Sequence, residues 1–150
     1  MDFLTGQRLL YSSQRYSSIY DHFRENYNIK TAELFLICMA IGFHKGEKIK
    51  REDKGSEFRS NYFSTKQRAS FYSIVLTDPE LGKEVERFND SDFQLKAVRT
   101  VEDYAEAGMT TLVEEVFMQK WDGNKLDETY KEYEVDILSY IYNLTDETPF

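Results

Sequence analysis

The chain of 150 residues contains very little cysteine, little proline and no long apolar run. Its single cysteine, Cys38, excludes an intramolecular disulfide, and its only prolines are Pro79 and Pro149. The first thirty residues lack the charged start, apolar stretch and small-residue cleavage site of a secretory signal. The longest apolar run, residues 34–41, is much shorter than the ~20 residues that cross a bilayer. We therefore expect a protein of the reducing cytoplasm with no membrane contact.

The motifs of the common enzyme classes are also missing. There is no Gly-x-x-x-x-Gly-Lys phosphate loop and no Gly-x-Ser-x-Gly elbow. Neither His22 nor His44 has a cysteine or histidine at zinc-site spacing, and the helical di-metal motif Glu-x-x-His does not occur. Glu52-Asp53-Lys54 matches the end of a nuclease pattern, but that pattern requires strands, and the sequence predicts none. We therefore predict that the protein is not an enzyme and has no catalytic residue, metal site or cofactor.

Charge is abundant, and it is divided unequally along the chain. Residues 1–76 carry 12 Lys+Arg and 8 Asp+Glu, whereas residues 77–150 carry 7 and 19. The two halves therefore have net charges of +4 and −12, which together make the −8 of the whole chain. Such a distribution influences solubility and the choice of partner more than it influences the fold.

The spacing of apolar residues predicts helices almost throughout, and 15% aromatic residues suffice to fill one core. Residues 32–41 follow Thr31, are apolar on all sides and precede Gly42, which predicts a buried central helix with a glycine cap. Ser64 and Gln67 form a capping box, and Gly108 is expected to end a helix. The predicted fold is all-α: one compact domain over residues 1–150, a bundle of six or seven helices. The predicted helices cover residues 18–27, 31–41, 65–76, 79–88, 92–106, 109–117 and 126–144.

A basic loop over residues 44–63 is predicted where the helical periodicity disappears. Residues 44–68 contain 8 Lys+Arg and 4 Asp+Glu, with three aromatic residues among them. Since cations contact phosphates and aromatic rings stack on bases, this segment is the candidate nucleic-acid interface, and DNA would contact the N-terminal half alone. The candidate nucleic-acid-binding residues are Lys45, Lys48, Lys50, Arg51, Lys54 and Arg59.

A stripe of apolar residues with heptad-like spacing runs along the last predicted helix. From Leu126 to Leu144 its members are 4, 3, 4, 3 and 4 residues apart. The stripe is typical either of a helix that docks onto its own domain or of a seam with another subunit, which could be a second copy. Tyrosine suits an interface because it buries a large area while its hydroxyl tolerates water. The candidate partner-binding residues are Tyr130, Tyr133, Ile137, Tyr140 and Leu144.

Two segments carry a resemblance to a known family. Residues 30–43, an apolar helix followed by Gly42-Phe43 and then by basic residues, resemble the signature of small proteins associated with DNA-phosphorothioation (dnd) systems. Residues 102–112, Glu-Asp-Tyr-Ala-Glu-Ala-Gly-Met-Thr-Thr-Leu, are similar to the Glu-x-Tyr-Ala-x-x-Gly-x-x-x-Leu stretch of the same family. The resemblance implies a bacterial accessory protein, encoded beside phage-defence systems and accompanying larger ATPase or nuclease subunits. It implies no catalytic residue.

Three functions are consistent with the sequence. The leading hypothesis is a non-catalytic accessory or adaptor subunit of a bacterial anti-phage defence assembly. The first alternative is a nucleic-acid-binding or regulatory protein that uses the loop at residues 44–68. The second alternative is an acidic inhibitor that mimics DNA, for which residues 77–150 would present the charge.

Overall fold

The computed structural model describes residues 3–146, and about two thirds of these are helical. The prediction of a compact, mostly helical chain is therefore confirmed, whereas a purely all-α fold is wrong because a small sheet is present. The α-helices are α1 (Ser17–Tyr27), α2 (Thr31–Lys45), α3 (Thr65–Thr77), α4 (Ser91–Leu112) and α5 (Tyr133–Asp146), and the strands are β1 (Leu9–Ser13) and β2 (Lys54–Arg59). Short 3₁₀ segments cover Phe3–Gly6, Ser60–Tyr62, Leu81–Arg87 and Met118–Lys120, and a π-helical segment covers Val113–Phe117.

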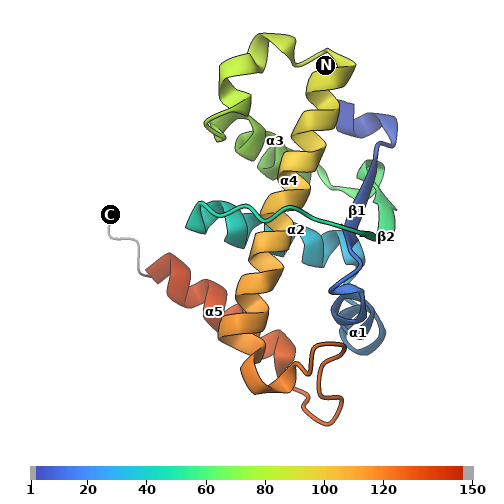
Figure 1. Ribbon diagram of the computed structural model, residues 1–150, viewed down its shortest axis with the longest axis vertical. Coiled ribbons are helices and arrows are strands. Elements are labelled where there is room, and N and C mark those ends of the chain that lie inside the picture. The colour runs from blue at the N-terminus through green and yellow to red at the C-terminus, as the bar shows by residue number, and fades with distance from the viewer. Residues whose placement is uncertain (1–2, 147–150) are drawn as a thin grey trace.

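The crossing of α2 and α4 organises the molecule. α4 runs along its length and α2 crosses it near the middle (Figure 1). The helices touch at two glycines: a Cβ on Gly42 would overlap the carbonyl of Tyr104, and a Cβ on Gly108 would overlap the carbonyl of Cys38. Both backbones can approach this closely because neither glycine carries a side chain.

The expected roles of these glycines were therefore wrong. α2 continues past Gly42 to Lys45, and its left-handed cap is Gly46, with φ of 68°. α4 likewise continues through Gly108, so the two helices expected over residues 92–117 are one α-helix extended by the π-helical segment. A glycine inside an apolar helical pattern marks either an end or a close contact, and here the partner helix determines which.

The sheet was not predicted: β2 lies within the predicted loop of residues 44–63, and β1 precedes the first predicted helix. β1 and β2 are antiparallel, with Leu9 opposite Arg59 and Leu10 opposite Phe58. Leu10 and Phe58 are buried in the core, while most of the other strand residues are polar or small. Because the strands are this short and only a few of their side chains point inward, they lack the apolar alternation by which strands are recognised.

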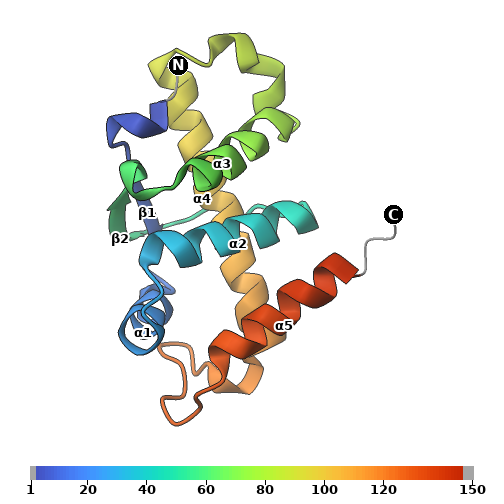
Figure 2. The ribbon, with the colours of Figure 1, turned by 180° about the vertical axis from the view of Figure 1, so that it is seen from behind.

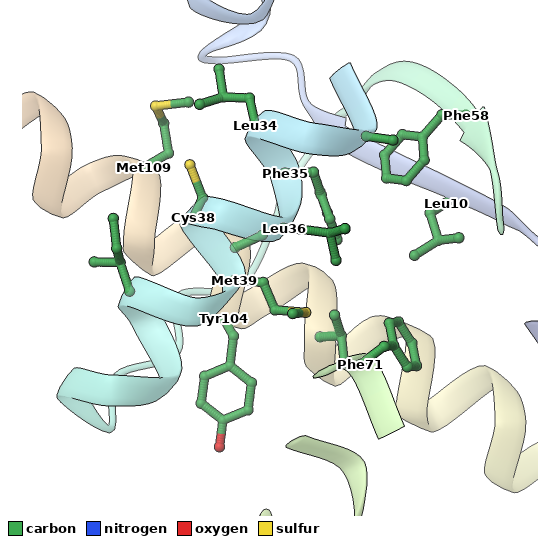
Figure 3. Packing of buried hydrophobic residues seen from close by; sticks show 14 of the residues in the cluster. Leu10, Leu34, Phe35, Leu36, Cys38, Met39, Phe58, Phe71, Tyr104 and Met109 are labelled. Carbon is green, nitrogen blue, oxygen red and sulfur yellow. The ribbon is translucent and has the colours of Figure 1, made fainter. Parts of the chain in front are cut away.

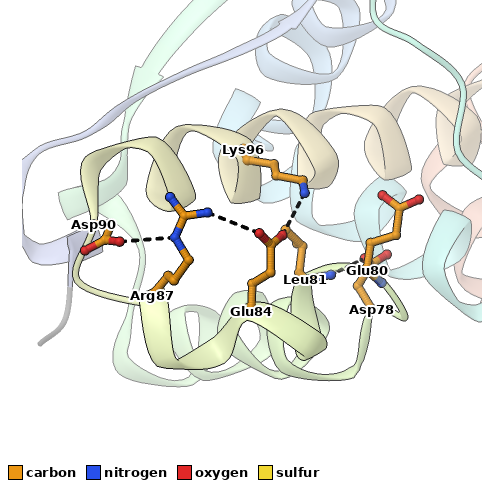
Figure 4. A network of polar contacts seen from close by, with 7 residues as sticks. All are labelled: Asp78, Glu80, Leu81, Glu84, Arg87, Asp90 and Lys96. Atoms are coloured by element: carbon orange, nitrogen blue, oxygen red, sulfur yellow. Dashed lines mark hydrogen bonds and ion pairs between the residues drawn. The ribbon is translucent and has the colours of Figure 1, made fainter.

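The helix predicted after Asp78-Pro79 is a 3₁₀ segment, Leu81–Arg87, with non-helical dihedrals at Glu84. The Asp78 carboxylate accepts hydrogen bonds from the backbone N–H groups of Glu80 and Leu81, so it does initiate the turn. Ion pairs then hold the segment in place (Figure 4). The Glu84 carboxylate contacts Lys96 Nζ at 2.7 Å and an Arg87 guanidinium nitrogen at 3.3 Å.

Other local predictions are confirmed. α1 covers the predicted range of residues 18–27 within one residue. At the start of α3, Ser64 Oγ accepts from Gln67 N, and the Gln67 side chain accepts from Ser64 N, as a capping box requires. The core around α2 and α4 contains Cys38, Tyr104 and many aliphatic and aromatic side chains (Figure 3).

Within residues 3–146, no helix is both long enough and apolar enough to span a membrane.

Candidate functional site

The side chains with catalytic potential are dispersed. Cys38 is buried at the α2–α4 crossing, and this burial raises the pKa of its thiol, so the reactive thiolate is suppressed. His22 packs edge-on against the Tyr133 ring, and burial lowers its pKa. Among residues 3–146, no group of three or more His, Cys, Asp or Glu side chains is arranged to hold a metal ion. We therefore turn to the two binding surfaces that the sequence predicted, the basic loop and the stripe on the last helix.

The basic loop folds onto the acidic half of its own chain. Residues 46–53 cross α4 on the face opposite α2, so α4 passes between them (Figure 1). The backbone N–H of Ile49 donates to the Asp103 carbonyl, and that of Arg51 donates to the Asp103 carboxylate. The basic loop is therefore held against α4, which belongs to the acidic half of the chain.

Three of the six candidate nucleic-acid-binding cations are paired with carboxylates of the second half. Lys45 Nζ lies 2.6 Å from a Glu115 oxygen, and Lys48 Nζ lies 3.3 Å from an Asp78 oxygen. Lys48 also lies over the ring of Tyr104. These cations already have partners, which weakens their case as a phosphate-binding surface.

The third pair, Arg51 with Glu102, is buried. The Arg51 side chain is 10% exposed, and its guanidinium donates to Glu102 at 2.9 Å. Glu102 also accepts from the backbone N–H of Tyr11 at 2.8 Å. Burial raises the pKa of Glu102, while the Tyr11 N–H and the Arg51 guanidinium act in the opposite direction. Arg51 therefore fastens the loop to α4 and β1 through Glu102, and its contact with nucleic acid stays a prediction.

The other three cations, Lys50, Lys54 and Arg59, are exposed. Lys54 Nζ lies 4.5 Å from the centre of the Tyr11 ring. A pocket of about 330 Å³ is lined by four cations and three carboxylates. The cations are Lys50, Arg51, Lys54 and Arg99, and the carboxylates are Glu52, Glu102 and Asp103. This mixture of charges differs from the continuous basic track that a phosphate backbone requires.

The stripe predicted on the last helix belongs mainly to the protein's own core. α5 begins at Tyr133, so Leu126 and Tyr130 precede it. Tyr133 is 0% exposed and Ile137 is 4% exposed, which removes both from any surface that a partner could reach. The Tyr133 hydroxyl donates to the Asp127 carbonyl, and the partly buried Tyr130 donates to Asp136. For these residues, the interpretation of a helix docked onto its own domain is the one the structure supports.

The other two residues of that stripe, Tyr140 and Leu144, are partly buried. Leu144 and its neighbour Ile141 form one wall of an apolar groove of about 700 Å³, which we call the α2–α5 groove. α2, α3 and α5 all lie on the same side of α4, and the groove is lined by residues of these three helices (Figure 2).

The opposite wall of the α2–α5 groove is one face of α2. Leu36, Ile37, Ala40 and Ile41 line it, at the spacing of adjacent helical turns. Ile37 is only partly buried and Ala40 is exposed, although the sequence predicted a helix buried on all sides. An all-round apolar helix is normally covered all round. Within the described residues, this face of α2 is covered only in part.

A second apolar stripe on α5 was missed from the sequence. Val135, Leu138 and Tyr142 are 52%, 60% and 69% exposed, and we call them the outer stripe. Their spacing of three and four residues is the same signal that identified the buried stripe. On the helix, Leu138 lies next to Ile141, so the outer stripe continues the wall of the α2–α5 groove around α5.

Comparison of the chain with protein-family models, with curated proteins and with solved structures found no match.

Proposed function

We propose that the protein is a non-catalytic accessory or adaptor subunit of a bacterial anti-phage defence assembly, and that it binds a larger subunit through α5. The observation that carries the proposal is the distribution of apolar side chains around this helix. Tyr133 and Ile137 anchor α5 to the core, while Leu138 and Tyr142 project into solvent from the same short helix. Large, clustered apolar side chains on a surface are typical of protein-binding sites.

The defence context rests on the family resemblance, and the structure shows what the resembling segments do. Residues 30–43 contain Gly42 and residues 102–112 contain Gly108, the two glycines at which α2 and α4 touch. The resembling segments therefore coincide with a packing contact of this fold. The resemblance leaves the partner, an ATPase or nuclease subunit, to be identified by experiment.

The two alternative functions have less support. A nucleic-acid interface loses Arg51 to burial and Lys45 and Lys48 to ion pairs. A DNA mimic needs free carboxylates, yet Asp78 and Glu102 bind cations of the protein's own first half. Both alternatives need unpaired charges, whereas in the folded protein these cations and carboxylates pair with one another.

Co-expression with the ATPase and nuclease subunits encoded beside the gene tests the proposal. We expect size-exclusion chromatography to show a stable complex with the wild-type protein. Leu138→Glu should abolish it, because a carboxylate replaces an apolar contact at an exposed position where folding is unaffected. Asn143→Glu, at an exposed position on the far side of the same helix from Leu138, is the matched control and should retain the complex. A wild-type protein that forms no complex with any of these subunits, or a Leu138→Glu variant that binds normally, contradicts the proposal.

A further inference from the structure

The α2–α5 groove runs beside three turns of α2. Its α2 wall extends from Glu33 to His44, which is about three helical turns or ~17 Å along the axis. Ile37 and Ala40 are the accessible apolar side chains of this wall, one turn apart and backed by the buried Leu36 and Ile41. Ile141 and Leu144 face them across the groove. An amphipathic helix with apolar anchors three and four residues apart matches such a surface.

The charges around the groove indicate the chemistry of its occupant. No lysine or arginine is among the described residues that line it, whereas Glu33 is. On α5, Glu134 lies on the same face as Leu138 and Ile141, so a carboxylate precedes the groove along that helix. The chain as a whole is acidic, with a formal net charge of −8. A positively charged helix is attracted to this border, and a second copy of this acidic surface is repelled.

We propose that the α2–α5 groove binds an amphipathic helix of the partner protein whose apolar face is flanked by lysine or arginine. This inference rests on the proposed function and specifies its partner: Ile37, Ala40, Ile141 and Leu144 contact the apolar anchors, and Glu33 and Glu134 attract the flanking cations. The outer stripe extends the contact around α5. Electrostatic attraction selects the partner and speeds association, while apolar burial supplies most of the affinity.

A fluorescein-labelled model peptide tests the groove without the native partner. The probe is an 18-residue amidated helix with leucines at positions i, i+3, i+4, i+7 and i+11 and lysines on the other faces. Two controls are a peptide in which glutamates replace the lysines and a scrambled peptide of the same composition with no apolar face. We expect fluorescence anisotropy to show binding of the lysine peptide that is at least tenfold tighter than binding of either control.

Substitutions at Ala40 locate the binding site. Ala40 is exposed and lines the groove, so Ala40→Trp fills the groove without changing the charge or entering the core. It should weaken peptide binding at least tenfold, whereas the matched variant Ser139→Trp, outside the groove, should change it less than twofold. Ala40→Lys should also weaken binding, and circular dichroism should show that all three variants retain the helical content of the wild-type protein.

Several outcomes overturn the inference. Equal binding of the scrambled peptide, or unchanged binding by Ala40→Trp and Ala40→Lys, shows non-specific attraction to an acidic protein. A wild-type dimer in light scattering that Ala40→Trp dissociates shows that a second copy occupies the groove. Each of these results leaves the proposed function open, because that proposal is tested by the complex with the native subunits and by Leu138→Glu. Conversely, peptide binding at the groove with no native complex supports the groove and refutes the defence subunits as partners.

Discussion

Replacing Gly108 with alanine tests the contact on which the fold depends. In an ordinary helix, alanine is more favourable than glycine by up to about 1 kcal/mol, so this substitution normally stabilises. At Gly108 the new Cβ would overlap the carbonyl of Cys38 on α2. The obstacle is backbone, which cannot rotate away as a side chain does, so α2 and α4 must separate. The sign of the stability change therefore distinguishes a helix-crossing glycine from an incidental one.

The magnitude follows from two opposing terms. Overpacking a close contact costs about 1–3 kcal/mol, and a backbone obstacle places Gly108→Ala at the upper end. Subtracting the gain of about 1 kcal/mol in helix propensity leaves a net destabilisation of about 2 kcal/mol. For a chain of 150 residues, this lowers the melting temperature by about 4–8 °C.

Urea unfolding followed by far-ultraviolet circular dichroism measures the effect. Gly6→Ala is the control, because the space around Gly6 is open and its φ lies outside the left-handed region. It should leave the free energy of unfolding unchanged or raise it by up to about 1 kcal/mol. A Gly108→Ala protein as stable as the wild type would refute the reasoning, as would a Gly6→Ala protein that is destabilised equally. A combined Gly42→Ala and Gly108→Ala variant should show non-additive effects, since both residues act at one crossing.

Three further predictions concern packing, the buried ion pair and pH. Ile137→Ala should destabilise the protein by about 2–5 kcal/mol in urea unfolding, because Ile137 is buried. Leu138→Ala, at the next and exposed position, should change stability by less than about 0.5 kcal/mol. Equal effects would contradict the orientation of α5. Arg51→Ala should cost about 3–5 kcal/mol, because it leaves the Glu102 carboxylate buried without its cation, and Arg51→Lys should recover part of the loss; a neutral result would show that the loop is not held by this pair. Burial raises the pKa of Glu102 and Glu106, so the folded state binds protons more tightly than the unfolded state. The stability that these groups contribute is therefore greatest when the pH is below the ordinary glutamate pKa of 4.5, and it is lost as the pH rises above that value. Glu106→Gln should make this loss smaller in unfolding curves measured from pH 4 to pH 8.

The local features of the chain could be predicted from its sequence. The starts of α1 and α3 fall within one residue of prediction, and the capping box of Ser64 and Gln67 is formed as expected. These features depend on hydrogen bonds and side-chain spacing within a few residues, which the sequence displays directly. The mostly helical character follows from the same local periodicity.

The role of each charged or apolar surface could not be predicted in the same way. The spacing of the cations at residues 45–54 predicts a nucleic-acid interface. In the structure, Arg51 instead pairs with Glu102, which lies fifty-one residues further along the chain. Both stripes of α5 have the same spacing, and only packing against the core shows that Ile137 is inside and Leu138 outside. Sequence spacing identifies a face of a helix but contains no information about what lies opposite it.

The sequence by itself determined that this protein is a helical, acidic chain with its charge divided between two halves. The tertiary structure decided what those properties do. Contact between α2 and α4 makes Gly42 and Gly108 packing residues, and the loop across α4 turns the divided charge into internal ion pairs. Because these outcomes depend on groups far apart in the chain, they arise only when the chain folds, as does the exposure of Leu138 and of the α2–α5 groove.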